Sequence, residues 1–219
     1  KLWIPQDTEA QQDQATYASQ FPPTVRINQV VLESKTPGGA LSKDFLKGAL
    51  DLHFQIEALA TVATETETAH NLTTLCVPQP GQGHPCFISS ILGAWNYKTA
   101  DVEADANPLA TLNAQGKTED DMRRALGKPT FSGSSVTGAD VLMVTYFLKN
   151  GAEELGSGMD VNADAWEQEL LTLLGCDTPA CDGDGVCACS YQSDQFKVFA
   201  RAQRSFGDAF GSVIRGDVG

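Results

Sequence analysis

Six cysteines are the residues of this sequence with the clearest chemistry, and they form two groups. Cys76 and Cys86 stand apart from four others that crowd near the C-terminal end: Cys176, Cys181, Cys187 and Cys189. An even number of cysteines with such dense spacing is typical of disulfides made in an oxidising compartment. Cys76 and Cys86 are predicted to pair, because neither has another partner in its region. The four late cysteines allow three pairings, and the sequence does not choose among them.

A structural zinc site is the alternative use of four clustered thiolates. The spacing disfavours this alternative, because no C-x-x-C motif occurs and a single residue separates Cys187 from Cys189. The three histidines, His53, His70 and His84, all lie far from this cluster in the sequence. Disulfides are therefore the favoured interpretation of all six cysteines.

A calcium site is a weaker hypothesis for the same region. Asp182 and Asp184 alternate with glycines, and Asp177 is close by, so their carboxylates could gather around Ca²⁺. The segment lacks the glutamate that closes an EF-hand loop. A solvated hairpin bounded by disulfides is the favoured interpretation, and no metal ion is expected elsewhere.

Motifs for catalysis or cofactor binding are missing from the sequence. It contains no G-x-S-x-G nucleophile elbow, H-E-x-x-H motif, P-loop or G-x-G-x-x-G fingerprint. Paired acids such as Glu153 and Glu154 lie in polar surroundings, where nothing apolar would raise a carboxyl pKa. We therefore expect neither catalysis nor a bound cofactor.

The overall composition excludes several classes of partner. The 219 residues carry 28 acidic and 15 basic side chains, for a formal net charge of −13. Nucleic acid is not an expected partner, because binding phosphates requires a basic face. No run approaches the ~20 apolar residues that span a bilayer, and the 42% apolar content is typical of a globular domain. The sequon at Asn71 predicts glycosylation and an extracellular or luminal location.

The elements that would position these residues begin with a strand and a helix. Residues 24–33 are β-branched and apolar on both faces, which is typical of an internal strand. Ser42 is expected to cap a helix that runs to about Ala60. Its apolar stripe repeats every three or four residues: Phe45, Ala49, Leu52, Ile56 and Leu59. His53 lies beside this stripe and is interpreted as a packed core histidine, and a short strand is expected at 72–77.

The second half of the chain continues with alternating elements. Residues 140–149 are apolar on both faces and predict another central strand. A helix is expected at 162–175 and a half-exposed strand at 196–201. Between the two halves, short helices are expected, one of them over 118–126 with Thr118 as its N-cap.

The resulting order is strand, helix, strand, long insertion, strand, helix, strand. This order is the β-α-β-β-α-β unit of ferredoxin-like folds, so an α+β domain with a four-stranded antiparallel sheet and two helices is predicted. The domain is expected over 24–204, with a helical, disulfide-bearing insertion at about 78–136 and a cysteine-rich loop at 175–190. Residues 1–23 are expected to lead into this domain and residues 205–219 out of it, as in a piece of a longer protein.

Five segments in order along the chain carry a family resemblance. They are Leu2-Trp3-Ile4-Pro5 with Phe21-Pro22-Pro23, then 50–56, 75–76 with 85–92, 140–150, and Arg204-Ser205-Phe206-Gly207-Asp208. They resemble segments of the Patched, Niemann-Pick C1 and Dispatched group of RND-type, sterol-sensing-domain transporters. The first resembles the stretch after the first transmembrane helix, and the last resembles the stretch before the second. Patched-like members are closest, because the sequence lacks the long, glycosylation-rich insertions of Niemann-Pick C1-like members.

The resemblance implies the first extracellular or luminal domain of a multi-pass transporter in the plasma membrane or an endomembrane. Such a domain is expected to form, with the second ectodomain of the same chain, a passage for a sterol or other lipid. It is also expected to present loops to partners such as a secreted protein ligand. Ion coupling in this family belongs to transmembrane helices outside this sequence, so the domain is not expected to transport alone.

A lipid passage requires apolar side chains that the core of the domain does not consume. The short helix expected near residues 88–95 offers the candidates for such lipid-facing positions: Ile88, Ile91, Leu92 and Trp95. Packing of this helix against the sheet is the alternative. For the whole chain two other functions stay open, a stand-alone secreted binding module and a secreted hydrolase.

Overall fold

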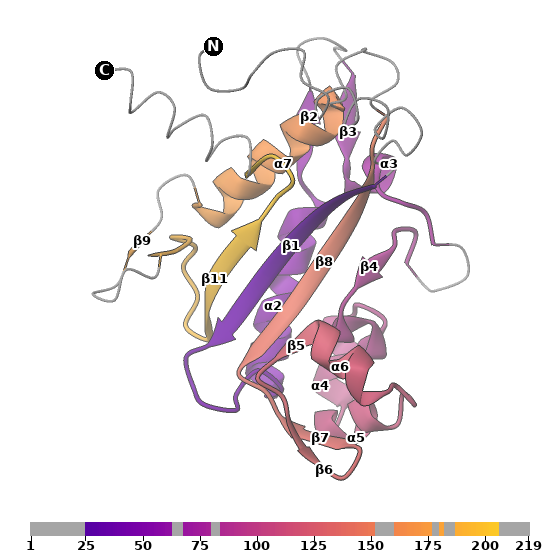
Figure 1. Cartoon of the computed structure of the whole chain (residues 1–219), viewed down its shortest axis with the longest axis vertical. Coiled ribbons are helices and arrows are strands. Elements are labelled where there is room, and N and C mark those ends of the chain that lie inside the picture. The colour runs from indigo at the N-terminus through magenta and orange to yellow at the C-terminus, as the bar shows by residue number, and fades with distance from the viewer. Residues whose placement is uncertain are drawn as a thin grey trace, which may run out of the picture.

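The computed structural model of the chain describes residues 25–62, 68–79, 84–151, 160–176, 180–181 and 187–205. These residues build a mixed α+β domain around an antiparallel sheet (Figure 1). The sheet follows the order β11-β1-β8-β4, with the short β5 also paired to β8. Its strands are β1 (Val25–Ser34), β4 (Ile88–Ser89), β5 (Leu126–Gly127), β8 (Val141–Lys149) and β11 (Phe196–Arg201).

The two strands predicted to be central are central, and every pairing in this sheet is antiparallel. Their two faces differ in burial, however, although the sequence is apolar on both. On β1, Val30 and Leu32 are buried, whereas Ile27 on the opposite face is 50% exposed. The described helices therefore cover one sheet face and leave apolar side chains of the other in contact with solvent.

Helix α2 (Lys43–Glu57) lies on the buried face of the sheet. The Ser42 hydroxyl accepts a hydrogen bond from the Phe45 amide, so the predicted N-cap is confirmed. The apolar stripe of the helix faces the core, and the rings of Phe45 and Phe196 pack edge to face with centroids 5.3 Å apart. The helix ends at Glu57, slightly earlier than expected.

Helix α7 (Val161–Leu174) contacts the same sheet face near the start of β1. Asp160 caps its first turn, and Gly175 ends it with a φ of 68°, a left-handed conformation that favours glycine. Glu167 is fully buried and binds the guanidinium of Arg26 through two hydrogen bonds of 2.9 and 2.6 Å. This ion pair joins the helix to the first strand.

The prediction of a strand at 72–77 is wrong. The chain instead forms the hairpin β2 (Ala60–Val62) and β3 (Ala69–Asn71), followed by the single-turn helix α3 (Leu72–Leu75). Asn71 and Thr74 exchange side-chain and backbone hydrogen bonds in a capping box. This local cap outweighs the weak strand preference of the segment.

Within the segment expected as the insertion, β4 and β5 join the main sheet, and the other small elements lie at one end of it (Figure 1). They are the 3₁₀ helix η1 (Ile91–Trp95), α4 (Thr99–Ala104), α5 (Pro108–Asn113), α6 (Glu119–Ala125) and the hairpin of β6 (Thr130–Ser132) with β7 (Ser135–Gly138). Thr118 caps α6 through a capping box with Asp121, which confirms the predicted start of that helix.

Two disulfides are present among the described residues, Cys76–Cys86 and Cys176–Cys189. The first confirms the predicted local pair, and the second selects one bond for the late group. Cys181 and Cys187 are register partners of the short strands β9 (Ala180–Cys181) and β10 (Cys187–Ala188), but their side chains lie outside the described residues. In the described ranges no helix has the length and apolar character needed to cross a bilayer.

Candidate functional site

Two histidines and a glutamate gather where α2 ends against the loop closed by the first disulfide. His53 and Glu57 lie one turn apart on α2, and His84 comes from the Cys76–Cys86 loop. One side-chain ligand atom from each of the three lies within 4.8 Å of the others. This cluster is the strongest candidate site in the described part of the chain.

His53 enters the core because it stands beside the buried stripe of α2. Only 1% of the residue is exposed, and its Nδ1 lies 3.0 Å from the hydroxyl of Tyr146 on β8. Its Nε2 is buried without a hydrogen-bond partner, and the nearby Oε2 of Glu57 is 3.6 Å away. Buried polar atoms in proteins are nearly always paired, so this free ring nitrogen requires an explanation.

His84 reaches the cluster because its loop is fixed at both sides. The disulfide joins Cys76 to Cys86, and the Phe87 amide donates a 2.7 Å hydrogen bond to the Val77 carbonyl. The Nδ1 of His84 lies 3.0 Å from the amide nitrogen and 3.1 Å from the carbonyl oxygen of Cys86. Its Nε2 points the other way and lies 2.5 Å from Oε1 of Glu57.

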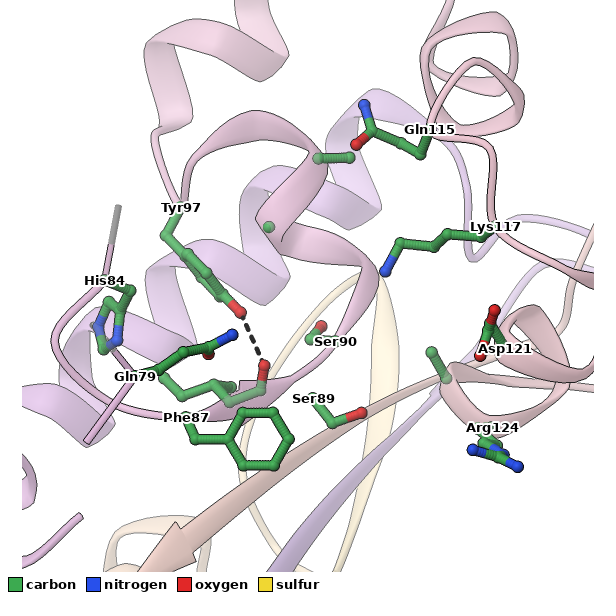
Figure 2. Close-up of a pocket in the computed structure, with 14 residues that line it drawn as sticks. Gln79, His84, Phe87, Ser89, Ser90, Tyr97, Gln115, Lys117, Asp121 and Arg124 are labelled. Carbon is green, nitrogen blue, oxygen red and sulfur yellow. Dashed lines mark hydrogen bonds between the residues drawn. The ribbon is translucent and has the colours of Figure 1, made fainter. Parts of the chain in front are cut away.

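Tyr97 packs its ring against both histidines. The ring centroids are 5.0 Å from His53 and 5.2 Å from His84. Asn96 and Tyr97 both have left-handed backbones, with φ of 51° and 54°, which is costly for non-glycine residues and places the ring here. The hydroxyl donates a 3.3 Å hydrogen bond to the Ile88 carbonyl, drawn in Figure 2.

Burial dominates the electrostatics of the cluster. Burial lowers the pKa of His53 to about 4, although the nearby Glu57 carboxylate opposes this change and His84 adds to it. Burial also raises the pKa of Tyr97 to about 12 and that of Tyr146 well above its ordinary value. His53 is therefore neutral at physiological pH, which is the protonation state in which imidazole binds a metal.

Two imidazole nitrogens and a carboxylate are a donor set that suits zinc and other divalent transition metals. The same groups could also form a hydrogen-bonded network without an ion. His84 and Glu57 already form such a contact, but the Nε2 of His53 takes no part in it. The geometry therefore offers one unused donor atom to a ligand.

A cleft of about 500 Å³ lies beside the cluster, and the disulfide loop, η1 and α6 all contribute to its lining (Figure 2). His84, Phe87 and Tyr97 line one side of it, and Lys117 directs its amino group into it from the insertion. Most of the other lining groups are polar. The cleft therefore suits a polar ligand or an ion rather than a lipid.

The four lipid-facing candidates are buried in the core, so the expectation that they line an exposed groove is wrong. They are Ile88, Ile91, Leu92 and Trp95, none more than 7% exposed. The alternative of simple packing holds, because η1 packs against α4 and α5, and Ile88 stands on β4, which pairs with β8. Exposed apolar side chains lie instead on the uncovered sheet face, where Phe87 stacks on Phe147 with ring centroids 4.7 Å apart.

The other predicted site residues are placed only in part. Asn71 is exposed, as a glycosylation acceptor must be, and its side-chain oxygen accepts a hydrogen bond from the Thr74 amide. The weak calcium candidates Asp177, Asp182 and Asp184 lie outside the described residues.

His53 is a packed core histidine, as predicted, but the prediction did not include Glu57 and His84 beside it. A signal was present, because His53 and Glu57 are spaced four residues apart and therefore share one helix face. No local pattern connects this pair to His84, which is 31 positions after His53 and reaches the cluster through the fold. Comparison of the sequence with known family models and with curated proteins finds no match.

Proposed function

We propose that this chain is an extracellular or luminal domain of an RND-type, Patched-like transporter. In that setting it forms part of the wall of a passage for a sterol or other lipid and presents loops to partners. It carries no catalytic role. The observation that carries the proposal is the group of exposed apolar side chains on the uncovered sheet face, at the end where β1 begins.

The strand order supports this assignment. The path β11-β1-β8-β4 is antiparallel throughout, and helices α2 and α7 follow the two central strands in sequence. Numbered as four core strands, this order is 4-1-3-2, which is the order of a ferredoxin-like β-α-β-β-α-β unit. We interpret the core as ferredoxin-like, the type of subdomain that the family resemblance implies.

The uncovered sheet face has the properties of a lipid contact. Where β1 begins, Ile27 is the register partner of Phe147 on β8, and Val25 precedes Ile27. The ring of Phe87 stacks on the ring of Phe147. Val25, Ile27 and Phe87 are 37%, 50% and 38% exposed. Large side chains gathered this way on one surface favour a hydrophobic partner over water. Sterol, which is flat and rigid, is the partner to which the proposal commits.

The disulfides support an extracellular or luminal location. Cys76–Cys86 and Cys176–Cys189 would be reduced in the cytosol, and structural disulfides are rare there. The exposed sequon at Asn71 agrees with this location. These features apply equally to a secreted module, so they support the compartment rather than the transport role.

Photo-crosslinking in the full-length parent protein tests the transport role. Cells expressing the parent protein are labelled with a photoreactive sterol, and labelling of this domain is measured. Ile27→Arg is expected to lower labelling about three- to tenfold, because covering the exposed half of one isoleucine side chain is worth about 0.8–1.5 kcal/mol.

Phe54→Arg is the matched control for this experiment. Phe54 is another exposed apolar side chain, 39% accessible, but it stands on α2 behind the opposite sheet face. Equal labelling of both variants and the parent protein would contradict the proposal. A parent transcript with a signal peptide before this sequence and a stop codon after it would instead make the chain a stand-alone secreted binding module.

A further inference from the structure

We propose that His53, Glu57 and His84 bind one zinc ion. The proposal goes beyond the transport role and does not depend on it. It rests on a three-ligand cluster with a buried, unpartnered nitrogen directed into it.

The first argument is the orphaned nitrogen of His53. The side chain of His53 is fully buried, and its Nε2 has no hydrogen-bond partner. Leaving a buried polar atom unpaired costs about 1–3 kcal/mol. A metal ion bound at this atom would remove that cost, because the lone pair of a neutral imidazole is then used.

The second argument is that each histidine has a partner for its other ring nitrogen. Metal-binding histidines commonly donate the remaining N–H to an oxygen, which fixes the tautomer. The Nδ1–H of His53 can donate to the Tyr146 hydroxyl at 3.0 Å, which leaves the lone pair of its Nε2 for the ion. The Nδ1 of His84 accepts the Cys86 amide hydrogen at 3.0 Å when no ion is bound, so zinc binding requires the His84 proton to move from Nε2 to Nδ1, where it faces the Cys86 carbonyl at 3.1 Å.

The third argument is distance. A tetrahedral zinc ion with bonds of about 2.0–2.1 Å holds its ligand atoms about 3.3 Å apart. The carboxylate of Glu57 now lies 2.5 Å from His84 Nε2 and 3.6 Å from His53 Nε2. The three ligand atoms lie within 4.8 Å of one another, so zinc binding would draw the two imidazoles together and rotate Glu57, whose side chain is 31% exposed at the end of α2.

Three protein ligands leave one tetrahedral position for water or another small ligand. His84 also lines the neighbouring cleft of about 500 Å³, which provides a route from solvent to the ion. The site differs from the zinc site weighed for the late cysteines, because it uses no thiolate and lies at the other disulfide.

Metal titration of the full chain tests the proposal. The chain is treated with EDTA, exchanged into metal-free buffer and titrated with Zn²⁺ by calorimetry, then with Co²⁺ as a spectroscopic substitute. The expected results are binding of one zinc ion per chain, visible Co²⁺ absorption bands of a four-coordinate site, and a higher thermal unfolding midpoint with zinc.

His84→Gln and Glu57→Gln are the test variants. Each is expected to weaken zinc binding at least about 100-fold, since even the loss of an outer-shell partner costs 10–100-fold. His84→Gln keeps the formal net charge of −13, so it separates the site from general attraction of cations to an acidic protein. His70→Gln is the control, because His70 lies on β3 outside the cluster and should bind zinc normally.

Circular dichroism of each metal-free variant shows whether it is folded. The two test side chains are at least partly accessible, so their replacement is expected to leave the fold intact. Absence of zinc binding and of Co²⁺ bands in the unaltered chain would overturn the proposal. Unchanged affinity in a folded His84→Gln variant would overturn it equally, because the ion would then be bound elsewhere.

Discussion

Arg26 and Glu167 form an ion pair that is almost entirely removed from water. Burial opposes the charged form of Arg26, but the hydrogen bonds and charge of Glu167 outweigh it and raise the arginine pKa above its ordinary value. Glu167 also accepts the Arg204 backbone amide at 3.0 Å, and Asp164 binds the Arg204 side chain at 2.7 Å. One glutamate thus connects the first strand, α7 and the segment after β11.

Glu167→Ala is expected to lower the free energy of unfolding by about 3 kcal/mol, because it leaves the buried charge of Arg26 with only the longer 3.3 Å contact to Asp164. Chemical denaturation followed by circular dichroism measures this change. Glu169→Ala is the control, since Glu169 stands on the same helix with its side chain exposed. A loss below about 1 kcal/mol for Glu167→Ala would show that Arg26 finds water or another partner.

At the scale of elements, the two disulfides have similar loops but different neighbours. Cys76–Cys86 closes a loop with a separation of 10 residues and positions His84, whereas Cys176–Cys189 spans 13 residues and joins the end of α7 to the segment before β11. Their contributions to stability should be similar, because the entropy of loop closure changes little between these lengths. Their effects on the histidine cluster should differ.

Replacing either pair by serine is expected to lower the free energy of unfolding by about 3 kcal/mol. Only Cys76→Ser with Cys86→Ser should also weaken zinc binding, because only that loop carries His84. Denaturation and zinc calorimetry on both double variants make the comparison. Equal zinc affinity in the two would show that the loop holds His84 in place without its disulfide.

At the scale of the whole molecule, the net charge opposes self-association, whereas the exposed apolar side chains of the uncovered sheet face favour it. A formal charge of −13 keeps copies of the chain apart at neutral pH. This repulsion vanishes near the isoelectric point of about 4.5. At that pH no net charge keeps two copies apart, so exposed apolar side chains such as Ile27 and Phe87 can make contact between them.

The chain is therefore expected to self-associate as the pH falls from 7 toward about 4.5. Sedimentation velocity at several pH values measures the change, and circular dichroism verifies that the protein is still folded. Ile27→Arg should reduce the association more than Phe54→Arg, although both add one positive charge. A folded monomer at pH 4.5, or equal effects of the two variants, would argue against the sheet face as the surface through which copies associate.

The sequence by itself determined the elements whose signals are local. Ser42 and Thr118 marked helix starts because an N-cap acts within three residues, and the apolar runs of β1 and β8 identified the central strands. The Cys76–Cys86 bond also followed from short separation. The capped turn at Asn71 was missed because weak strand and helix preferences compete there.

Only the tertiary structure decided which apolar faces are covered and which distant side chains meet. Hydrophobic pattern marks a strand as central without saying whether a second layer lies on it, so the exposure of Ile27 could not be predicted. The burial of the apolar residues in the insertion could not be predicted either, because it depends on the elements packed around each side chain and not on the residue type alone. His84 joins His53 and Glu57 because a disulfide-closed loop folds back on α2, a contact that no spacing in the sequence encodes.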